Sequence, residues 1–191
     1  SPGDGVHRAA VTHDEHAVGA GPHVVVQQCL QEGRQRRLRL RHCGSERGDA
    51  GVAAITLSVD VPEGLMIDGY PGSYGQILTN LFLNAANHAF ADGRSGTISI
   101  SARARGSDDV EIIFADNGAG MTPDVQRQAF DPFFTTRRNE GGTGLGLHIV
   151  YNLVTQQLGG RMMLESRLGQ GTTFRIIMPK VAKGGSTGEP T

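Results

Sequence analysis

Two glycine clusters, joined by an aromatic-rich segment, constrain this chain more than any other feature of its sequence. The first, DNGAG, begins at Asp116, and the second, GGTGLG, ends at Gly146. The run VEIIFA before the first cluster predicts a strand, so Asp116 falls at a strand end, where ligands commonly bind. The second cluster precedes apolar residues at helical spacing, and a glycine-rich entry into a helix offers free N–H groups to phosphates. Residues 116–147 therefore predict a nucleotide pocket with a movable cover.

Composition narrows the expected partners and compartment. The 191 residues carry a formal net charge of -1, and no run of Lys or Arg with interleaved aromatics is present, so nucleic acid is not an expected partner. Cys29 and Cys43 form no CxxC pair, which supports neither a zinc site nor a disulfide framework and leaves a reducing cytoplasm as the default. No stretch approaches the roughly 18 apolar residues of a membrane span. We therefore expect no membrane contact by this chain, and any membrane anchor of a parent protein is missing from it.

The first part of the chain gives little structural signal. Residues 1–50 lack a sustained period of two or 3.6, which predicts a lead-in, a linker or a poorly ordered segment. A helix over about 22–41, containing the VVVQQCL run, is an alternative. From Val52 the pattern changes, because AAITLSVDVP alternates as a strand and the LMID run after the PEG turn predicts its partner in a hairpin-like pair.

A helix over about 74–90, with Ser73 as its N-cap, follows this pair. Its apolar residues recur at i, i+3 and i+4 and should pack on a sheet, whereas Asn80, Asn84 and His88 form a polar row along one side. Such a row faces either water or a ligand, and the helix alone does not decide between the two.

Further strands are predicted at TISISARAR, VEIIFAD, MMLES and TTFRIIMP, and a second helix at LHIVYNLVTQQL. The predicted fold class is α/β (α+β), a two-layer sandwich in which helices cover one face of a mixed, mostly antiparallel sheet.

Four sequence boxes occur in a fixed order: the Asn-centred helix NLFLNA, then DNGAG, FDPFF and GGTGLGL. A lone DxGxG is weak evidence in a chain with 28 glycines, but four boxes in order are strong. They resemble the N, G1, F and G2 boxes of the ATP-binding catalytic domain of sensor histidine kinases, which has the Bergerat fold. Type II topoisomerases, MutL-type repair proteins and the ninety-kilodalton heat-shock chaperone share that fold. The resemblance implies a catalytic domain over 51–181, a flexible tail over 182–191, and ATP and Mg²⁺ as cofactors.

The resemblance assigns Asp116, Gly118, Gly120 and Thr172 to the adenine. Asp116 would accept a hydrogen bond from the adenine amino group, while the two glycines shape the pocket floor and Thr172 lies beside the base. Asn84 would coordinate Mg²⁺ through its side-chain oxygen, and the triphosphate would supply most of the charge.

Other residues would meet the phosphates or move with the cover. His88 stands where the family often has a basic phosphate contact, and Arg137 would reach the γ-phosphate as a bidentate donor. The loop that wraps the phosphates comprises Gly142, Thr143, Gly144, Leu145 and Gly146. Three aromatics of the intervening segment either belong to the core or dock the lid when nucleotide binds: Phe130, Phe133 and Phe134.

One position separates the chemistries of the superfamily. Its ATP-hydrolysing members carry a glutamate general base one helical turn before the metal-binding Asn, where this chain has Asn80. The resemblance therefore implies slow hydrolysis and phosphoryl transfer to a histidine on a dimerisation domain, in the same parent protein or in trans, with a downstream response regulator. His13 with Asp14 is the nearest approach to an acceptor motif, but no Pro follows at the family's spacing.

The competing hypotheses are a nucleotide-binding regulatory module without transfer and a superfamily ATPase. The resemblance also implies a cytoplasmic location, alone or as the cytoplasmic part of a membrane-anchored sensor.

Overall fold

The computed structural model describes residues 36–42, 53–90, 94–138 and 142–181. The described strands form one sheet in the order β1-β2-β3-β4-β6-β5. Their bounds are β1 Arg36–His42, β2 Ala53–Asp60, β3 Gly96–Arg105, β4 Asp109–Asp116, β5 Arg161–Arg167 and β6 Gly171–Pro179. All neighbouring pairs are antiparallel except β2 and β3. These pairings confirm the mixed, mostly antiparallel sheet expected from the sequence.

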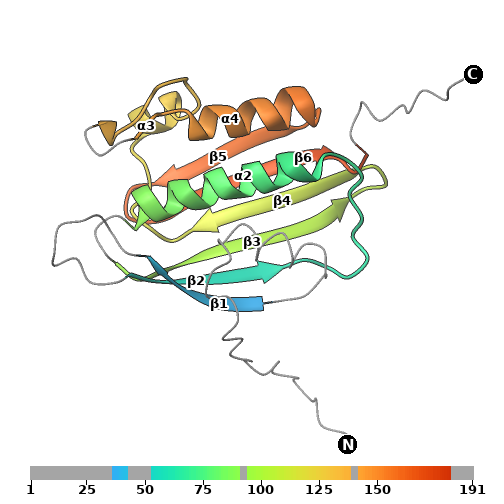
Figure 1. Cartoon of the computed structure of the whole chain (residues 1–191), viewed down its shortest axis with the longest axis horizontal. Helices are drawn as coiled ribbons and strands as arrows, with labels where there is room; N and C mark the ends of the chain where they lie inside the picture. Colours follow the sequence, from blue (N-terminus) through green and yellow to red (C-terminus); the bar gives the residue numbers. More distant parts are fainter. Residues whose placement is uncertain (1–35, 43–52, 91–93, 139–141, 182–191) are drawn as a thin grey trace, which may run out of the picture.

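Helices cover one face of this sheet and leave the other without a described helical layer (Figure 1). Helix α2 (Pro71–Asn84) continues into a π-helical turn, η2 (Ala85–Ala89), and α4 (Gly146–Asn152) continues into another, η4 (Leu153–Gln157). The short helix α3 (Pro123–Gln128) lies beyond α2 at the upper edge in Figure 1. The architecture is the predicted two-layer sandwich.

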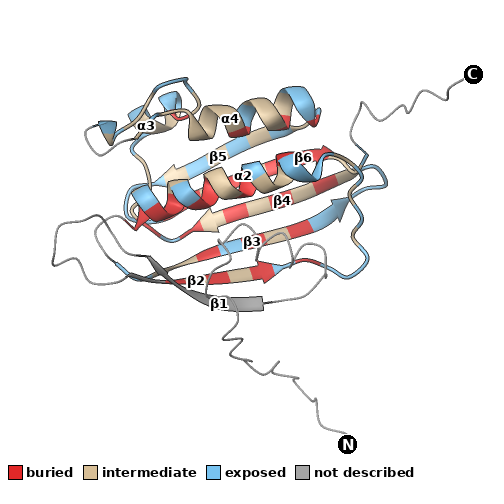
Figure 2. Ribbon diagram, viewed as in Figure 1, coloured by how far each residue is buried: buried red, intermediate tan, exposed pale blue. Residues whose placement is uncertain are grey.

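The core fills the space between the two layers. Figure 2 marks buried residues along α2, and buried residues alternate with less buried ones on much of β3 and along β4. The buried residues of α2 and of these strands belong to one hydrophobic cluster. Alternation places every second side chain of a strand on the helical side, where apolar burial favours the fold. The largest fully buried side chains are Phe90, Phe114, Phe174, Ile55, Leu57, Leu81, Ile98, Ile100, Leu158, Ile176 and Met178.

The predicted hairpin after β2 is wrong. The LMID run forms no strand, and within it only Asp68 makes a bridge, with Val181. The neighbour of β2 is instead β3, which runs parallel to it because the chain crosses over through α2 between the two strands. A short-range pattern cannot reveal a partner that lies across a helix.

The predicted start of the first long helix is also wrong. Helix α2 begins at Pro71 with Tyr70 as its N-cap, because proline lacks the N–H that the first turn leaves unpaired. Ser73 lies inside the helix, and its hydroxyl donates to Gln157 Oε1 at 3.1 Å, which ties the two long helices together.

Arg36–His42 forms β1 and pairs with β2, so this stretch is not the end of a helix over 22–41. The remainder of that alternative helix lies outside the described residues, and the domain boundary at 50/51 stays a prediction.

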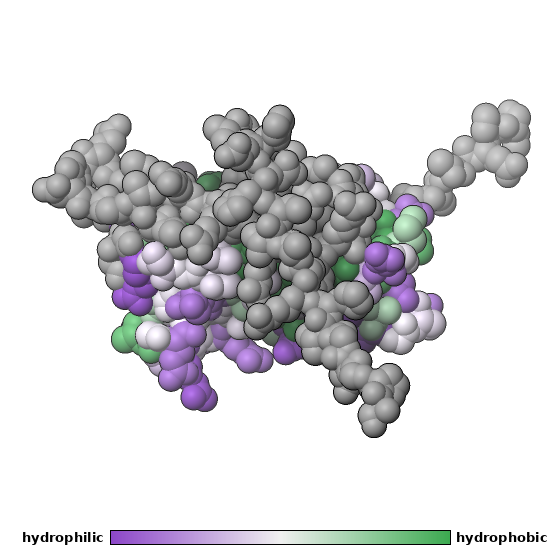
Figure 3. All heavy atoms as spheres, turned by 90° about the horizontal axis from the view of Figure 1, so that it is seen from below, coloured by the Kyte–Doolittle hydropathy of each residue, from purple (hydrophilic) through white to green (hydrophobic). Residues whose placement is uncertain are grey.

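Figure 3 views the molecule from below, which is the side of β1. Most of the described surface that is visible between the grey atoms is hydrophilic or of intermediate hydropathy. Among the described helices, none has the length and apolar character that a membrane crossing needs.

Candidate functional site

Two residues that the sequence predicts to contact adenine lie side by side at the end of β4. Asp116 is the last residue of β4, and the register of the sheet places it directly opposite Thr172 of β6. Both are buried, with exposed fractions of 8% and 4%. Asp116 Oδ1 accepts a hydrogen bond from the Gly118 N–H at 2.9 Å. The strand end therefore presents a buried carboxylate beside a buried hydroxyl.

Burial raises the pKa of Asp116, and backbone hydrogen bonds from Gly118 and Thr172 lower it by less. Desolvation penalises the ionised form, so the carboxylate is held at a cost in folding free energy. A cost of this kind at a strand end beside a cavity is typical of functional sites.

The glycines of the first cluster allow its turn to pack against two neighbours. A Cβ at Gly118 would lie 2.4 Å from Ala89 Cβ, and the Ala119 N–H donates to the Ala89 carbonyl at 2.9 Å. Gly120 has a φ of +67°, and a Cβ there would lie 2.0 Å from the Arg167 carbonyl oxygen. The turn is thus clamped between η2 and the end of β5.

Gly120→Ala is expected to lower the free energy of unfolding by about 2–4 kcal/mol, because the new methyl group meets backbone and the φ is left-handed. Chemical denaturation measures the change. Gly169→Ala is the matched control: its φ is +76°, but no atom lies within 4 Å of the added methyl group. Equal losses in the two variants would show that φ alone, and not the contact with Arg167, accounts for the effect.

Ser166 joins the first cluster to the turn between β5 and β6. Its hydroxyl oxygen accepts from the Met121 N–H at 2.8 Å and donates to the Gly171 carbonyl at 2.8 Å. It also lies 2.9 Å from Thr172 Oγ1. No sequence motif singled out this residue, because the MMLES pattern that contains it indicated only a strand.

Ser166→Ala is expected to lower the free energy of unfolding by about 1–3 kcal/mol, because it leaves buried backbone and hydroxyl groups without partners. It should also weaken nucleotide binding, since Thr172 loses its fixed position. Calorimetric titration with ATP and thermal unfolding measure the two effects. Ser99→Ala, which removes a longer 3.5 Å contact to the Ala115 carbonyl elsewhere on the sheet, should change neither by much. Unchanged binding in Ser166→Ala would separate this network from the ligand site.

A cavity of about 520 Å³ opens beside the first cluster. Its walls come from α2 and η2, from the residues after Gly120, and from the segment that leads into the second cluster. Nine of the predicted site residues line it: Asn80, Asn84, His88, Gly120, Arg137, Gly142, Thr143, Gly144 and Gly146. The cavity therefore brings together residues that are widely separated in the sequence.

Five predicted residues do not line this cavity. Asp116, Gly118 and Thr172 lie at the strand ends, next to the Gly120 wall, and Leu145 lies between two glycines that do line it. Phe133 has a positive φ of 64° and is 63% exposed, whereas its neighbour Phe134 lines the cavity. Lining residues that lie outside the four sequence boxes include Met121, Thr122, Val125, Thr135, Thr136 and Leu168.

The polar row of α2 faces this cavity. The Asn80 Nδ2 donates to the Gln76 carbonyl at 3.0 Å, and His88 Nδ1 lies 3.3 Å from Thr136 Oγ1. The Asn84 side chain has no hydrogen-bond partner among the described residues and remains available to a ligand. The row is therefore a cavity wall and not merely a solvated stripe.

Arg137 is the only charged residue among the described residues that line this cavity, and a guanidinium is a group that binds anions. Its Nη1 donates to the Asn87 carbonyl. This bond joins η2 to the lid segment, by which we mean the described residues 121–138 between the two glycine clusters. The second cluster also packs on this segment. Gly144 has a φ of +69°, and a Cβ there would lie 2.5 Å from the Phe133 carbonyl carbon, so only glycine allows this close approach.

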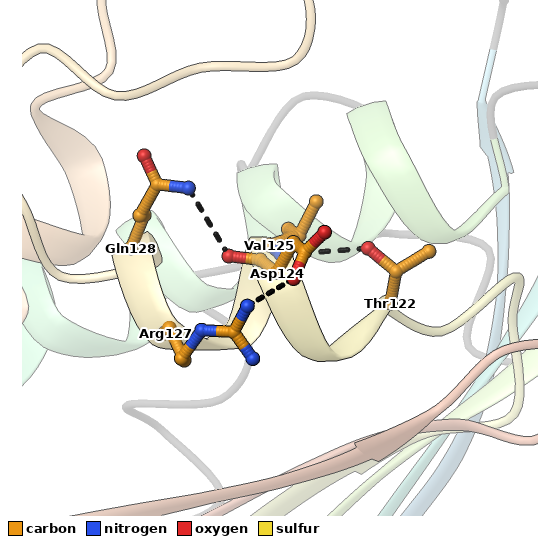
Figure 4. Close-up of polar contacts among 5 residues, drawn as sticks. All are labelled: Thr122, Asp124, Val125, Arg127 and Gln128. Carbon is orange, nitrogen blue, oxygen red and sulfur yellow. Dashed lines mark hydrogen bonds and ion pairs between the residues drawn. The ribbon is translucent and has the colours of Figure 1, made fainter.

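The lid segment begins with a short helix that is stabilised by its own side chains (Figure 4). The Thr122 hydroxyl caps α3 by accepting from the Val125 N–H at 3.4 Å, and Asp124 pairs with Arg127. The Gln128 Nε2 donates to the Asp124 carbonyl at 3.3 Å. These contacts stabilise α3 from within its own sequence.

No group of three or more His, Cys, Asp or Glu side chains suited to a metal occurs among the described residues. A metal ion in this cavity would therefore take most of its oxygen ligands from a bound anion, such as a polyphosphate. The amide oxygen of Asn84 is a neutral hard donor of the kind that Mg²⁺ accepts. The donor set thus fits a magnesium ion that arrives with a polyphosphate.

Comparison with protein families matches residues 69–182 to the family described as histidine kinase-, DNA gyrase B-, and HSP90-like ATPase. The sensor histidine kinase ZraS of Salmonella typhimurium is 42% identical over 117 residues, which are 61% of this chain and 24% of that protein. Sporulation kinase E of Bacillus subtilis is 38% identical over 109 residues, 57% of this chain and 14% of that protein. The chain spans about a quarter or less of these relatives.

Solved structures show the same likeness. The catalytic domain of histidine kinase ThkA superposes with a TM-score of 0.57 at 28% identity, over 66% of this chain and 81% of that one. Full-length ShkA in complex with AMPPNP superposes with a TM-score of 0.52 at 29% identity, over 65% of this chain and 25% of that one.

Proposed function

Because the chain belongs to the histidine kinase-, DNA gyrase B- and HSP90-like ATPase family, we propose that it binds ATP with Mg²⁺ and phosphorylates a histidine of a dimerisation domain. The observation that carries this proposal is the pairing of a buried carboxylate at a strand end with a cavity in whose described lining the only charged residue is a cation. The first suits an amine-bearing base and the second a polyphosphate. Full-length ShkA, a similar structure, was solved in complex with AMPPNP, which supports nucleotide binding.

In this proposal, Asp116 accepts a hydrogen bond from the adenine amino group, and Thr172 lies beside the base. The phosphates occupy the cavity between the polar row and the second glycine cluster. Asn84 supplies one oxygen to Mg²⁺, which neutralises charge on the triphosphate, and Arg137 and His88 bind phosphate oxygens. The protein contributes positioning and charge complementarity, which dominate phosphoryl transfer.

The described cavity wall offers no carboxylate to activate water at the equivalent of the superfamily's general base. That position is Asn80, whose side-chain N–H is already bonded to the Gln76 carbonyl. An amide cannot take a proton from water, so we favour transfer to a protein nucleophile over hydrolysis. This distinguishes the kinase from the ATPase alternative.

Partners are proposed from the relatives. ZraS is a sensor histidine kinase, and a complex of ThkA with the response regulator TrrA is among the similar folds. We propose that this chain acts with a histidine-bearing dimerisation domain, in the same parent protein or in trans, and that a response regulator receives the phosphoryl group. The proposal places the domain in the cytoplasm, where ATP is available.

Transfer of labelled γ-phosphate from ATP to a dimerisation domain supplied in trans tests this function. We expect acid-labile, base-stable label on the acceptor histidine, dependent on Mg²⁺ and absent with Asp116→Ala. ATP binding without label on a histidine-bearing acceptor would favour the regulatory module. Rapid acceptor-independent phosphate release would favour the ATPase.

A further inference from the structure

A second cavity, of about 300 Å³, lies between the N-terminal half of α2 and the sheet. Its lining comes from the connection between β2 and α2, from α2 itself, and from the inner face of β3, β4 and β6. In Figure 1 this end of α2 lies beside the end of β6, and the opposite end of the helix lies toward α3 and the lid. The cavity shares no described lining residue with the nucleotide cavity.

Among the described residues that line this cavity, Tyr74 supplies the only polar side chain, and no charged side chain contributes. The remaining walls are aliphatic, with Ile77 and Leu78 on the helix and Ala102 and Ile112 on the sheet. Ionic ligands would lose their hydration here without gaining a partner. An occupant must therefore be neutral and largely apolar.

The Tyr74 hydroxyl is buried and has no hydrogen-bond partner among the described residues. Buried polar groups in folded proteins are nearly always paired, so this unpaired hydroxyl beside a cavity is a group that a ligand in the cavity can satisfy. Burial and then the charge of Asp68 raise the pKa of Tyr74, so the hydroxyl keeps its proton at neutral pH. It can thus donate a hydrogen bond to an acceptor inside the cavity.

We propose that this cavity is a second ligand site, which binds a small neutral molecule with an apolar body and one hydrogen-bond acceptor directed at the Tyr74 hydroxyl. The volume stands at the lower end of the range of ligand pockets, which suits a compound of one or two rings. Met66 lines the cavity and is 80% exposed, so the opening to solvent lies at the β2–α2 connection. The site is independent of the proposed kinase function.

Two probes of the same shape test the proposal on the full chain. Acetophenone carries a carbonyl acceptor, and α-methylstyrene replaces that oxygen by a CH₂ group. We expect saturable binding of both, with acetophenone bound more tightly, by NMR titration that follows shifts of residues around the cavity. Excess ATP with Mg²⁺ should displace neither probe.

Variants then separate the hydrogen bond from the apolar volume. Tyr74→Phe should weaken acetophenone about fivefold and leave α-methylstyrene unchanged, because it removes only the donor. It should melt no lower than the wild type, since it also removes an unpaired buried hydroxyl. Ala102→Leu should abolish binding of both probes by filling the cavity.

Three results would overturn the proposal: no saturable acetophenone binding to the folded wild type, displacement of acetophenone by ATP, or an unchanged preference between the probes in Tyr74→Phe. If Ala102→Leu does not fold, the Tyr74→Phe comparison alone decides.

Discussion

Asp116→Asn is expected to weaken ATP binding by roughly 100-fold or more while stabilising the nucleotide-free protein. The Asn Oδ1 can replace the carboxylate oxygen that accepts from the Gly118 N–H. Its amide NH₂ then points where the carboxylate would meet the adenine amino group, so a donor faces a donor. The turn after residue 116 therefore keeps its hydrogen bond, whereas the adenine amino group loses its acceptor. Calorimetric titration with ATP measures the loss of affinity.

The gain in stability follows from the raised pKa of Asp116, which burial causes. The folded protein holds this proton more tightly than the unfolded chain, so the carboxyl group favours folding most at low pH. That contribution is lost as pH rises through the raised pKa, and it is absent at neutral pH. Asp116→Asn should therefore melt higher than the wild type at pH 7, and the difference should shrink toward the ordinary Asp range at about 4.

The melting temperature across this pH range is the control for the mechanism. A difference that stays constant with pH would show that the Asn gains through packing and not through the removal of a buried charge. ATP binding as tight in Asp116→Asn as in the wild type would remove Asp116 from the adenine site. Stabilisation of the wild type by ATP, about 2.7 kcal/mol at a hundredfold excess over Kd, gives the reference for the binding assay.

Asn84→Ala is expected to lower the rate of Mg²⁺-dependent phosphoryl transfer by roughly 100-fold, because it removes the side-chain oxygen available to the metal. ATP binding without Mg²⁺ should change little, since the adenine contacts stay intact. The Asn84 side chain has no hydrogen-bond partner among the described residues, so its removal should cost little stability. Single-turnover transfer, measured as a function of Mg²⁺ concentration, gives the effect.

Asn87→Ala is a matched control for this prediction. Asn87 lines the same cavity one turn later, but its backbone carbonyl, which the substitution keeps, is what binds Arg137. Its transfer rate should stay within a few-fold of the wild type. A similar loss in both variants would point to a general change of the cavity wall and not to a metal ligand at Asn84.

The elements whose signal is local could be predicted from the sequence. The alternation in TISISARAR and VEIIFAD became the β3–β4 hairpin. The family resemblance assigned both Asp116 and Thr172 to the adenine, and the register of β4 and β6 sets these two residues opposite each other. The parallel pairing of β2 with β3 was missed, because it depends on a crossover through α2 that no short pattern encodes. The start of α2 was misplaced, because Ser73 and Pro71 are both start signals and the proline decided the boundary.

In the candidate site as well, local spacing could be predicted from the sequence, whereas contacts between distant segments could not. Asn80, Asn84 and His88 could be predicted as one row from their spacing, but only the structure shows that the row faces a cavity. Ser166 was missed because its hydroxyl bonds to the Met121 N–H and the Gly171 carbonyl. Every residue type has these backbone groups, so no motif in the sequence can indicate such partners. Phe134 lines the cavity and Phe133 does not. Phe133 has a positive φ, and the spacing of aromatic residues in the sequence does not reveal this backbone conformation.

The position of β5 bears on how the protein behaves at high concentration. This strand ends the described sheet, and a strand at an edge can recruit the same strand of another molecule. Its exposed face carries Arg161, Glu165 and Arg167, with Met163 as the one apolar member. Charges along an edge oppose such recruitment, because pairing two edges would strip them of water. Met163→Lys should therefore be tolerated, whereas neutralising the three charges would leave the domain prone to self-association.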